Sequence, residues 1–204
     1  MVNLFKRYIH KYIKENKNEI AIIGIMLIVG VISGIIMFTL IKNASIDILV
    51  QSMNETLSLS TNKNFVKMSI ILNAVKNNAL LIVIMLFLSI TLIGKGSIYA
   101  ITLVKGIVMG IYACILLQIF GIGYGALVIF MQVILVNVIY IPAYIYLAVE
   151  LILFNMDLFK IRTSGINLYT KLATKIGAVF VVMFSSSIIE QIFTNISLNL
   201  YSKL

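Results

Sequence analysis

Apolar residues in this chain gather into five long runs, separated by shorter polar or glycine-rich segments. A helix needs about 20 mostly apolar residues to cross the hydrocarbon core of a bilayer. The pattern therefore predicts an all-α, polytopic membrane protein with about five transmembrane helices. The predicted spans are 20–41, 79–93, 97–119, 126–154 and 176–200.

Two further segments have an amphipathic pattern. In residues 1–19 apolar residues recur at helical spacing and basic residues take the other face, which predicts a helix on an anionic membrane surface. Residues 42–78 are the longest polar stretch and end in Asn77 and Asn78. This stretch fits a soluble loop, an interfacial hairpin or a re-entrant element, and we favour interfacial helices. Because the run 79–93 is short, we expect its helix to begin within that amphipathic stretch.

Composition agrees with a single integral membrane domain. Of the 204 residues, 61% are hydrophobic and only 11% are charged, which excludes an ordinary water-soluble globule. The formal net charge is +9, but the basic residues flank apolar runs, so we attribute the charge to membrane topology and not to nucleic-acid binding. We expect an N-terminus inside the cell, a C-terminus outside, and an extracytoplasmic 42–78 loop. With this orientation ten Lys and Arg residues lie inside and five outside.

The residue types that usually carry catalysis are scarce. His10 and Cys114 are the only residues of their kinds and would lie at different depths, so a paired nucleophile and base is not expected. The single cysteine cannot form a disulfide within the chain. The sequence also has no metal-ligand cluster and no phosphate-binding glycine loop. We therefore predict a protein without enzymatic activity, cofactor or metal.

Charged residues inside the spans are the main candidates for a special role, because such groups normally face a protein interior or a partner. Lys105 lies about 12 Å into the third span, and Glu150 lies near the inner end of the fourth. An ion pair between them is one interpretation. The other is that Lys105 extends its side chain toward the inner surface while Glu150 reaches the headgroups.

A second group of polar residues is expected nearer the outer surface. Glu190 lies about 21 Å into the fifth span, and Gln132 and Asn137 enter the fourth span from the same side. We favour hydrogen bonding of Glu190 to these two amides, with partner contact and a transport pathway as the alternatives.

Glycine and proline mark places where helices pack closely or bend. Gly30 and Gly34 form one small-xxx-small pair, and Gly106 and Gly110 form another beside Lys105. Such faces allow tight packing within the chain or with a partner, including a second copy of the chain. Pro142 lies inside the fourth span and is expected to kink it.

The order of these features resembles the stage II sporulation protein M family. A basic N-terminal segment precedes one span, and a polar loop ends in Asn77-Asn78. Lys105-Gly106 with Gly110 follows twelve residues after Ile93. Asn137 precedes Pro142 by five residues, and Glu190 lies near the end of the last span.

The resemblance implies a bacterial cell-membrane protein that acts during engulfment in endospore formation. It implies a non-enzymatic scaffold that recruits or holds two cell-wall hydrolases, stage II sporulation proteins D and P, at the septal membrane. The alternative function is a small transporter or permease subunit that uses Lys105, Glu150 and Glu190 as a polar route. A membrane protein of unrelated function with the same general layout is the third possibility.

Overall fold

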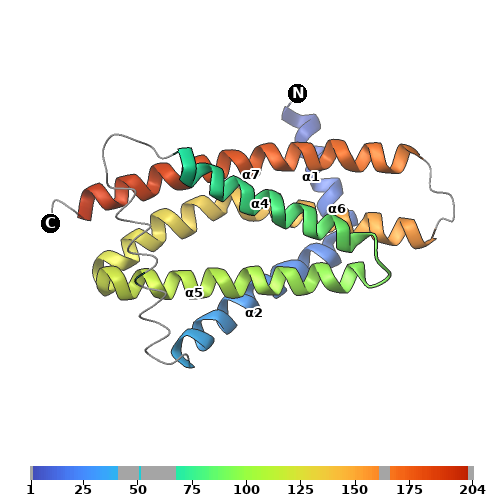
Figure 1. Ribbon diagram of the computed structural model, residues 1–204. Coiled ribbons are helices and arrows are strands. Elements are labelled where there is room, and N and C mark those ends of the chain that lie inside the picture. Colours follow the sequence, from blue (N-terminus) through green and yellow to red (C-terminus); the bar gives the residue numbers. More distant parts are fainter. Residues whose placement is uncertain (1, 41–50, 52–67, 161–165, 202–204) are drawn as a thin grey trace.

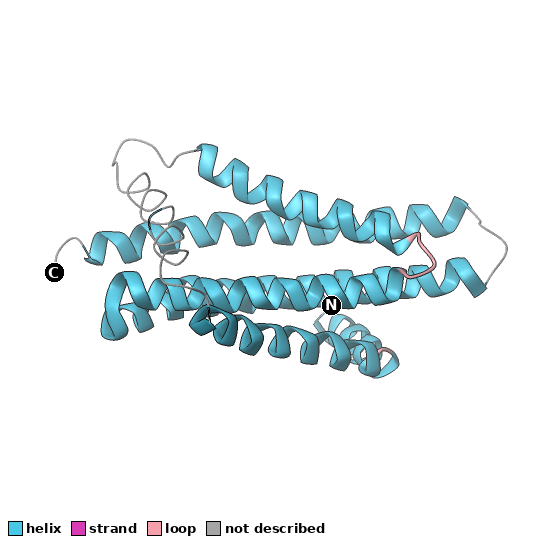
Figure 2. Ribbon diagram, turned by 60° about the horizontal axis from the view of Figure 1, so that its bottom comes forward, coloured by secondary structure: helices cyan, strands magenta, loops and turns pink. Residues whose placement is uncertain are grey.

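The structure, a computed structural model, describes residues 2–40, 51, 68–160 and 166–201, and the elements it assigns there are all helices. Figures 1 and 2 show an elongated bundle in which α4, α5, α6 and α7 lie lengthwise beside one another, and α2 crosses it obliquely. The predicted all-α class is therefore confirmed for this part of the chain. The elements are α1 (Val2–Glu15), α2 (Lys17–Leu40), α4 (Met68–Ser89), α5 (Gly94–Ile129), the π-helix η1 (Phe130–Leu135), α6 (Val136–Lys160) and α7 (Ile166–Tyr201).

Three stretches of the described chain are long and apolar enough to cross a membrane. They are Lys17–Leu40, Gly94–Phe159 and Tyr169–Thr194, and Val75–Ser89 is a shorter apolar helix. The five predicted runs thus correspond to three long stretches and one shorter helix.

The stretch Gly94–Phe159 is folded back on itself (Figure 1). Gly121 has a φ of 73°, a left-handed backbone angle that glycine adopts without the steric cost of a Cβ atom. On either side of this residue Leu116, Phe120 and Val128 form a small buried cluster. The predicted spans 97–119 and 126–154 leave residues 120–125 between them, and of these six only Gly121 has a non-helical backbone, with helix on both sides.

Helices α2 and α5 pack in parallel through their glycines. A Cβ atom added to Gly30 would lie 2.9 Å from Gly106 Cα, and one added to Gly110 would lie 3.2 Å from Gly34 Cα. Near the start of the two helices Lys95 Nζ lies 2.7 Å from Glu19 Oε1, and Tyr99 also donates a hydrogen bond to Glu19. The paired positions are each 76 residues apart (19 to 95, 30 to 106, 34 to 110). The two predicted small-residue faces therefore meet each other within the chain.

The connection between α4 and α5 is fixed by a side chain from α6. Asn155 Nδ2 donates hydrogen bonds to the carbonyls of Ser89 at 2.7 Å and Thr91 at 2.8 Å. A Cβ atom on Gly94 would lie 2.6 Å from the same Nδ2 atom. The predicted spans 79–93 and 97–119 put their connecting turn at 94–96, which is wrong in position, because the turn occupies 90–93 and α5 already begins at Gly94.

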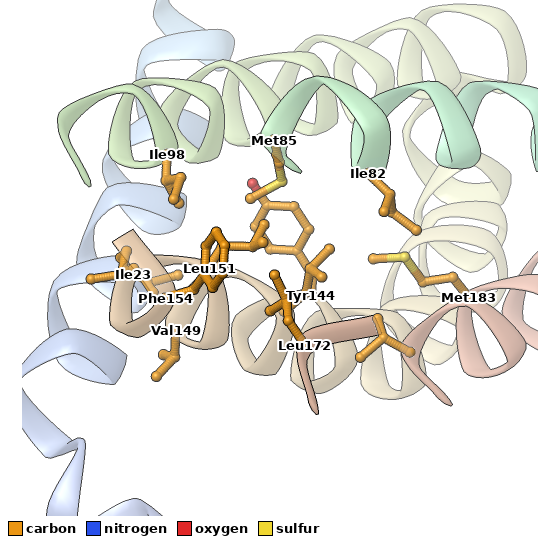
Figure 3. Packing of buried hydrophobic residues seen from close by; sticks show 14 of the residues in the cluster. Ile23, Ile82, Met85, Ile98, Tyr144, Val149, Leu151, Phe154, Leu172 and Met183 are labelled. Atoms are coloured by element: carbon orange, nitrogen blue, oxygen red, sulfur yellow. The ribbon is translucent and has the colours of Figure 1, made fainter. Parts of the chain in front are cut away.

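The main core lies where the five long helices meet (Figure 3). Each helix contributes at least one side chain that is fully or almost fully buried, including Ile23, Met85, Ile98, Tyr144, Leu151 and Met183. Large apolar side chains on the outer faces of the same helices are exposed, as expected for helices surrounded by lipid.

Other helix boundaries extend beyond the predicted ones. The helix of the short run 79–93 does begin earlier, at Met68, as expected. The polar segment 155–175 is mostly helical, because α6 continues to Lys160 and α7 begins at Ile166. Most of the predicted 42–78 loop, including its proposed interfacial helix, lies outside the described residues. Helix α6 is continuous through Pro142.

The glycine packing predicts opposite effects of the same substitution at two sites. Gly106→Ala places a methyl group 2.5 Å from the Leu27 carbonyl oxygen, so we expect the free energy of unfolding to fall by about 1–3 kcal/mol. Gly24 has nothing within 4 Å of its added Cβ, so Gly24→Ala should leave stability unchanged or raise it by about 0.5–1 kcal/mol. Unfolding in mixed micelles with increasing denaturing detergent measures both. Equal effects at the two glycines would contradict the packing.

Candidate functional site

A polar pocket of about 220 Å³ lies where α4, α5, η1, α6 and α7 meet. Thirteen residues line it, and nine of these are polar or charged or carry a hydroxyl group. The nine are Asn78, Lys105, Tyr112, Gln132, Asn137, Tyr140, Ser186, Ser187 and Glu190. We call this site the polar pocket.

Two opposite charges face the polar pocket from different helices. Lys105 comes from α5 and Glu190 from α7, both half-buried, and they attract each other electrostatically. The pair does not belong to the ion pairs within 4.0 Å found among the described residues. Lys105 Nζ instead lies 4.8 Å from the centre of the Tyr140 ring, within the range of a cation–π interaction. The two charges therefore share one space without direct contact.

One wall of the polar pocket is held by a chain of hydrogen bonds. Tyr140 Oη donates to Asn78 Oδ1 at 3.3 Å, and Asn78 Nδ2 donates to Ser187 Oγ at 3.0 Å. Ser187 Oγ in turn donates to the carbonyl of Met183 at 3.1 Å. Because these residues belong to α6, α4 and α7, the hydrogen bonds connect three helices. They also orient the Tyr140 ring, over which the Lys105 ammonium lies.

Another part of the pocket lining belongs to the π-helix. Such segments, in which each turn holds an extra residue, are frequent at functional sites. Gln132 lies in this segment, is buried, and accepts a hydrogen bond from Tyr112 Oη at 2.9 Å. Asn137 Nδ2 donates to the carbonyl of Val133 at 2.6 Å. The irregular turn thus brings two amides to the pocket wall and gives each a defined partner.

Two polar groups at the polar pocket have no partner in the described part of the chain. Ser186 Oγ is buried without a hydrogen bond. The Glu190 carboxylate likewise makes no side-chain hydrogen bond there, since only its backbone carbonyl accepts one, from Thr194. Because a buried polar group is normally satisfied, Ser186 indicates room for a further molecule beside the half-buried Glu190 carboxylate.

The outer group of predicted site residues does come together. Gln132, Asn137 and Glu190 all line the polar pocket, together with Asn78. Among the described residues, the expected hydrogen bonds between Glu190 and the two amides are not found. Gln132 Oε1 accepts from Tyr112, and Asn137 Nδ2 donates to the Val133 carbonyl.

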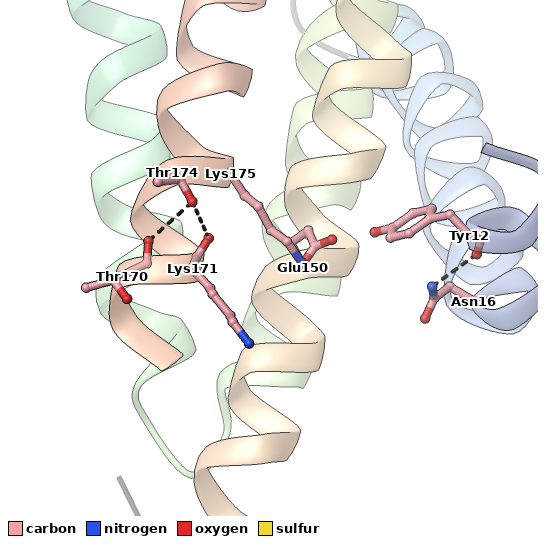
Figure 4. A network of polar contacts seen from close by, with 7 residues as sticks. All are labelled: Tyr12, Asn16, Glu150, Thr170, Lys171, Thr174 and Lys175. Atoms are coloured by element: carbon pink, nitrogen blue, oxygen red, sulfur yellow. Dashed lines mark hydrogen bonds and ion pairs between the residues drawn. The ribbon is translucent and has the colours of Figure 1, made fainter. Parts of the chain in front are cut away.

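Of the two interpretations of Lys105 and Glu150, the ion pair between them is wrong. Lys175 Nζ lies 2.6 Å from Glu150 Oε2, and Figure 4 shows this lysine reaching Glu150 from α7. Lys105 lies over Tyr140, and Glu150 is ten residues further along α6, which is about 15 Å of helical rise. Measuring depth along each span by itself missed this separation.

The Glu150–Lys175 ion pair connects α6 and α7. Glu150 is 5% exposed, and its Oε1 atom has no hydrogen bond to the described residues. Tyr12 of α1 points toward it from the other side (Figure 4), and its ring contacts that of Tyr146 of α6 in a tilted arrangement, with 5.2 Å between the ring centroids. This buried carboxylate is thus connected to α7 by an ion pair and faces α1.

The remaining candidate residues from the sequence lie outside the polar pocket. Gly106 and Gly110 face α2, while Pro142 and Asn77 are exposed. Sequence reasoning missed Tyr112, Tyr140, Ser186, Ser187 and Lys175. Helical spacing could have found several of them, because Ser186 and Ser187 precede Glu190 by four and three residues and so share its face.

Comparisons with known proteins found no relationship. A scan against models of protein families, a search of curated proteins and a search of solved structures each returned no match. The resemblance drawn from the order of motifs therefore stays a prediction, and functional inference depends on the geometry described above.

Because Glu150 pairs with Lys175 and not with Lys105, we expect energetic coupling between Glu150 and Lys175 only. In a double-mutant cycle, Glu150→Gln and Lys175→Met should show an interaction energy of about 0.5–3 kcal/mol, because either single change leaves a partly buried charge unpaired. The matched cycle of Glu150→Gln with Lys105→Met should be additive within about 0.5 kcal/mol. Unfolding in mixed micelles measures both cycles, and coupling in the Lys105 cycle alone would contradict the geometry.

Proposed function

We propose that the chain crosses the bacterial cell membrane five times, with its N-terminus in the cytoplasm. The crossings are α2, α4, the two arms of the folded stretch Gly94–Phe159, and α7. Parallel packing of α2 with α5 supports this arrangement, since both would then run outward. The end that holds the α4–α5 turn also carries Lys17, Lys95, Lys171 and Lys175, as the positive-inside rule expects of a cytoplasmic face.

The function that we propose is a non-enzymatic scaffold for the wall hydrolases of engulfment, at the septal membrane of a sporulating cell. The observation that carries it is a convergence. Asn78, Lys105, Asn137 and Glu190 each belong to a motif of the stage II sporulation protein M resemblance, and all four line the polar pocket although they come from four helices. Polar residues within spans tend to face the interior of a bundle, and these four, selected by the order of motifs, share one site there, which supports the resemblance.

In this proposal the closely packed helices α2 and α5 make the bundle rigid, and stage II sporulation proteins D and P bind at the outer side of the bundle. The basic face of α1 adds contact with anionic lipids. A second copy of the chain is a further possible partner.

Deletion of the gene in an endospore-forming host tests the proposal. We expect the mother-cell membrane to stop migrating around the forespore, and expression of the intact chain from another locus should restore migration. The measurement is fluorescence imaging of membranes in sporulating cells. Normal engulfment in the deletion strain would refute the scaffold function.

One observation favours a second candidate, a small transporter. The polar pocket is a charged space inside an apolar bundle, which is a common feature of intramembrane transport sites. A route through Glu150 is not part of this candidate, because Glu150 lies outside the pocket and pairs with Lys175.

Glu190→Gln separates the two candidates. A transporter should lose solute flux into vesicles while the protein still assembles. A scaffold should lose co-purification of the D and P hydrolases, because Glu190 lies toward the proposed outer side of the bundle. Lys76→Met, at an exposed position of α4, is the control and should change neither property.

A further inference from the structure

We propose that the polar pocket binds a small zwitterion, a molecule of amino-acid size that carries one carboxylate and one ammonium group. The proposal is independent of whether the chain serves as a scaffold or as a transporter. It rests on the two unpaired charges, the unsatisfied polar groups and the size of the pocket.

The charges define both ends of the ligand. Lys105 lies over the Tyr140 ring and forms no ion pair with Glu190, although both line the same pocket. A carboxylate would bind the Lys105 ammonium, and an ammonium would bind the Glu190 carboxylate. A zwitterion placed between them satisfies each charge with its opposite.

Singly charged ligands fit this site less well. An anion alone would pair with Lys105 but would bring a second negative charge near Glu190. A cation alone would pair with Glu190 and repel Lys105. Because an uncompensated charge in a low-dielectric interior is costly, either ligand should bind more weakly than one with both charges.

A further polar group of the pocket lining can complete the recognition. Ser186 Oγ is buried, without a hydrogen bond in the described structure, and belongs to the pocket lining one turn before Glu190. A hydroxyl can donate to a carboxylate or accept from an ammonium group. Val108, Met109, Val133 and Val136 supply apolar surface for a side chain of the ligand.

The volume restricts the ligand to a small molecule. About 220 Å³ is below the range of about 300–1,000 Å³ that is typical of sites for drug-sized ligands. The pocket therefore suits a single amino acid and not a peptide or a nucleotide.

Alanine and its two singly charged fragments provide the decisive comparison on the unchanged protein. The purified full chain in detergent is titrated with alanine, propionate and ethylamine, and with serine and leucine to vary the side chain. We expect at least one amino acid to raise the thermal unfolding midpoint and to give saturable heat in calorimetry at millimolar concentration. Propionate, which lacks the ammonium, and ethylamine, which lacks the carboxylate, should bind at least about tenfold more weakly.

Substitutions assign the binding to the pocket. Lys105→Met and Glu190→Gln should each weaken amino-acid binding at least about tenfold, while Lys76→Met and Glu15→Gln, at exposed positions, should leave it unchanged. Absence of saturable binding by the folded protein, equal binding of the singly charged fragments, or unaltered binding by folded pocket variants would each overturn the proposal. If the pocket variants do not fold, the fragment comparison alone decides.

Discussion

The close approach of α2 and α5 is the contact on which the rest of the structure depends. In lipid, apolar side chains gain little by moving from acyl chains to a helix interface, so association depends on packing and on polar contacts. Gly30 and Gly34 meet Gly106 and Gly110 with no side chain between the backbones, and the Glu19–Lys95 ion pair fixes the same register at the basic end. These contacts set both the position and the rotation of α5.

The rotation of α5 decides what the polar pocket contains. With Gly106 and Gly110 turned toward α2, the neighbouring face of the same helix carries Lys105 and Tyr112 into the pocket. One face of α5 thus packs closely against α2, and another face lines the charged polar pocket. The hydrogen-bond chain through Asn78 and the π-helix around Gln132 complete that space from the remaining helices.

The sequence predicted much of the fold because its signals are local. Apolar run length located the long helices, and glycine spacing located the faces that pack. It also placed Gln132, Asn137 and Glu190 in one group. The rotation of each helix about its own axis relative to its neighbours could not be predicted from these local signals. Lys105 and Glu150 looked like partners when depth was measured along each span, but Lys105 turns toward Tyr140 while Lys175 reaches Glu150 from α7. The π-helix and the turn held by Asn155 likewise depend on tertiary contacts.

The central claim is that Lys105 and Glu190 face each other across one pocket, and reversing their charges tests it most directly. Lys105→Glu and Glu190→Lys should each lower the yield of folded protein in detergent, measured by fluorescence-detected size exclusion. The two changes together should restore much of that yield, because the opposite charges again share the pocket. A double variant no better than the single ones, or an equal recovery with Lys105→Glu and Glu150→Lys, would contradict a shared pocket for Lys105 and Glu190.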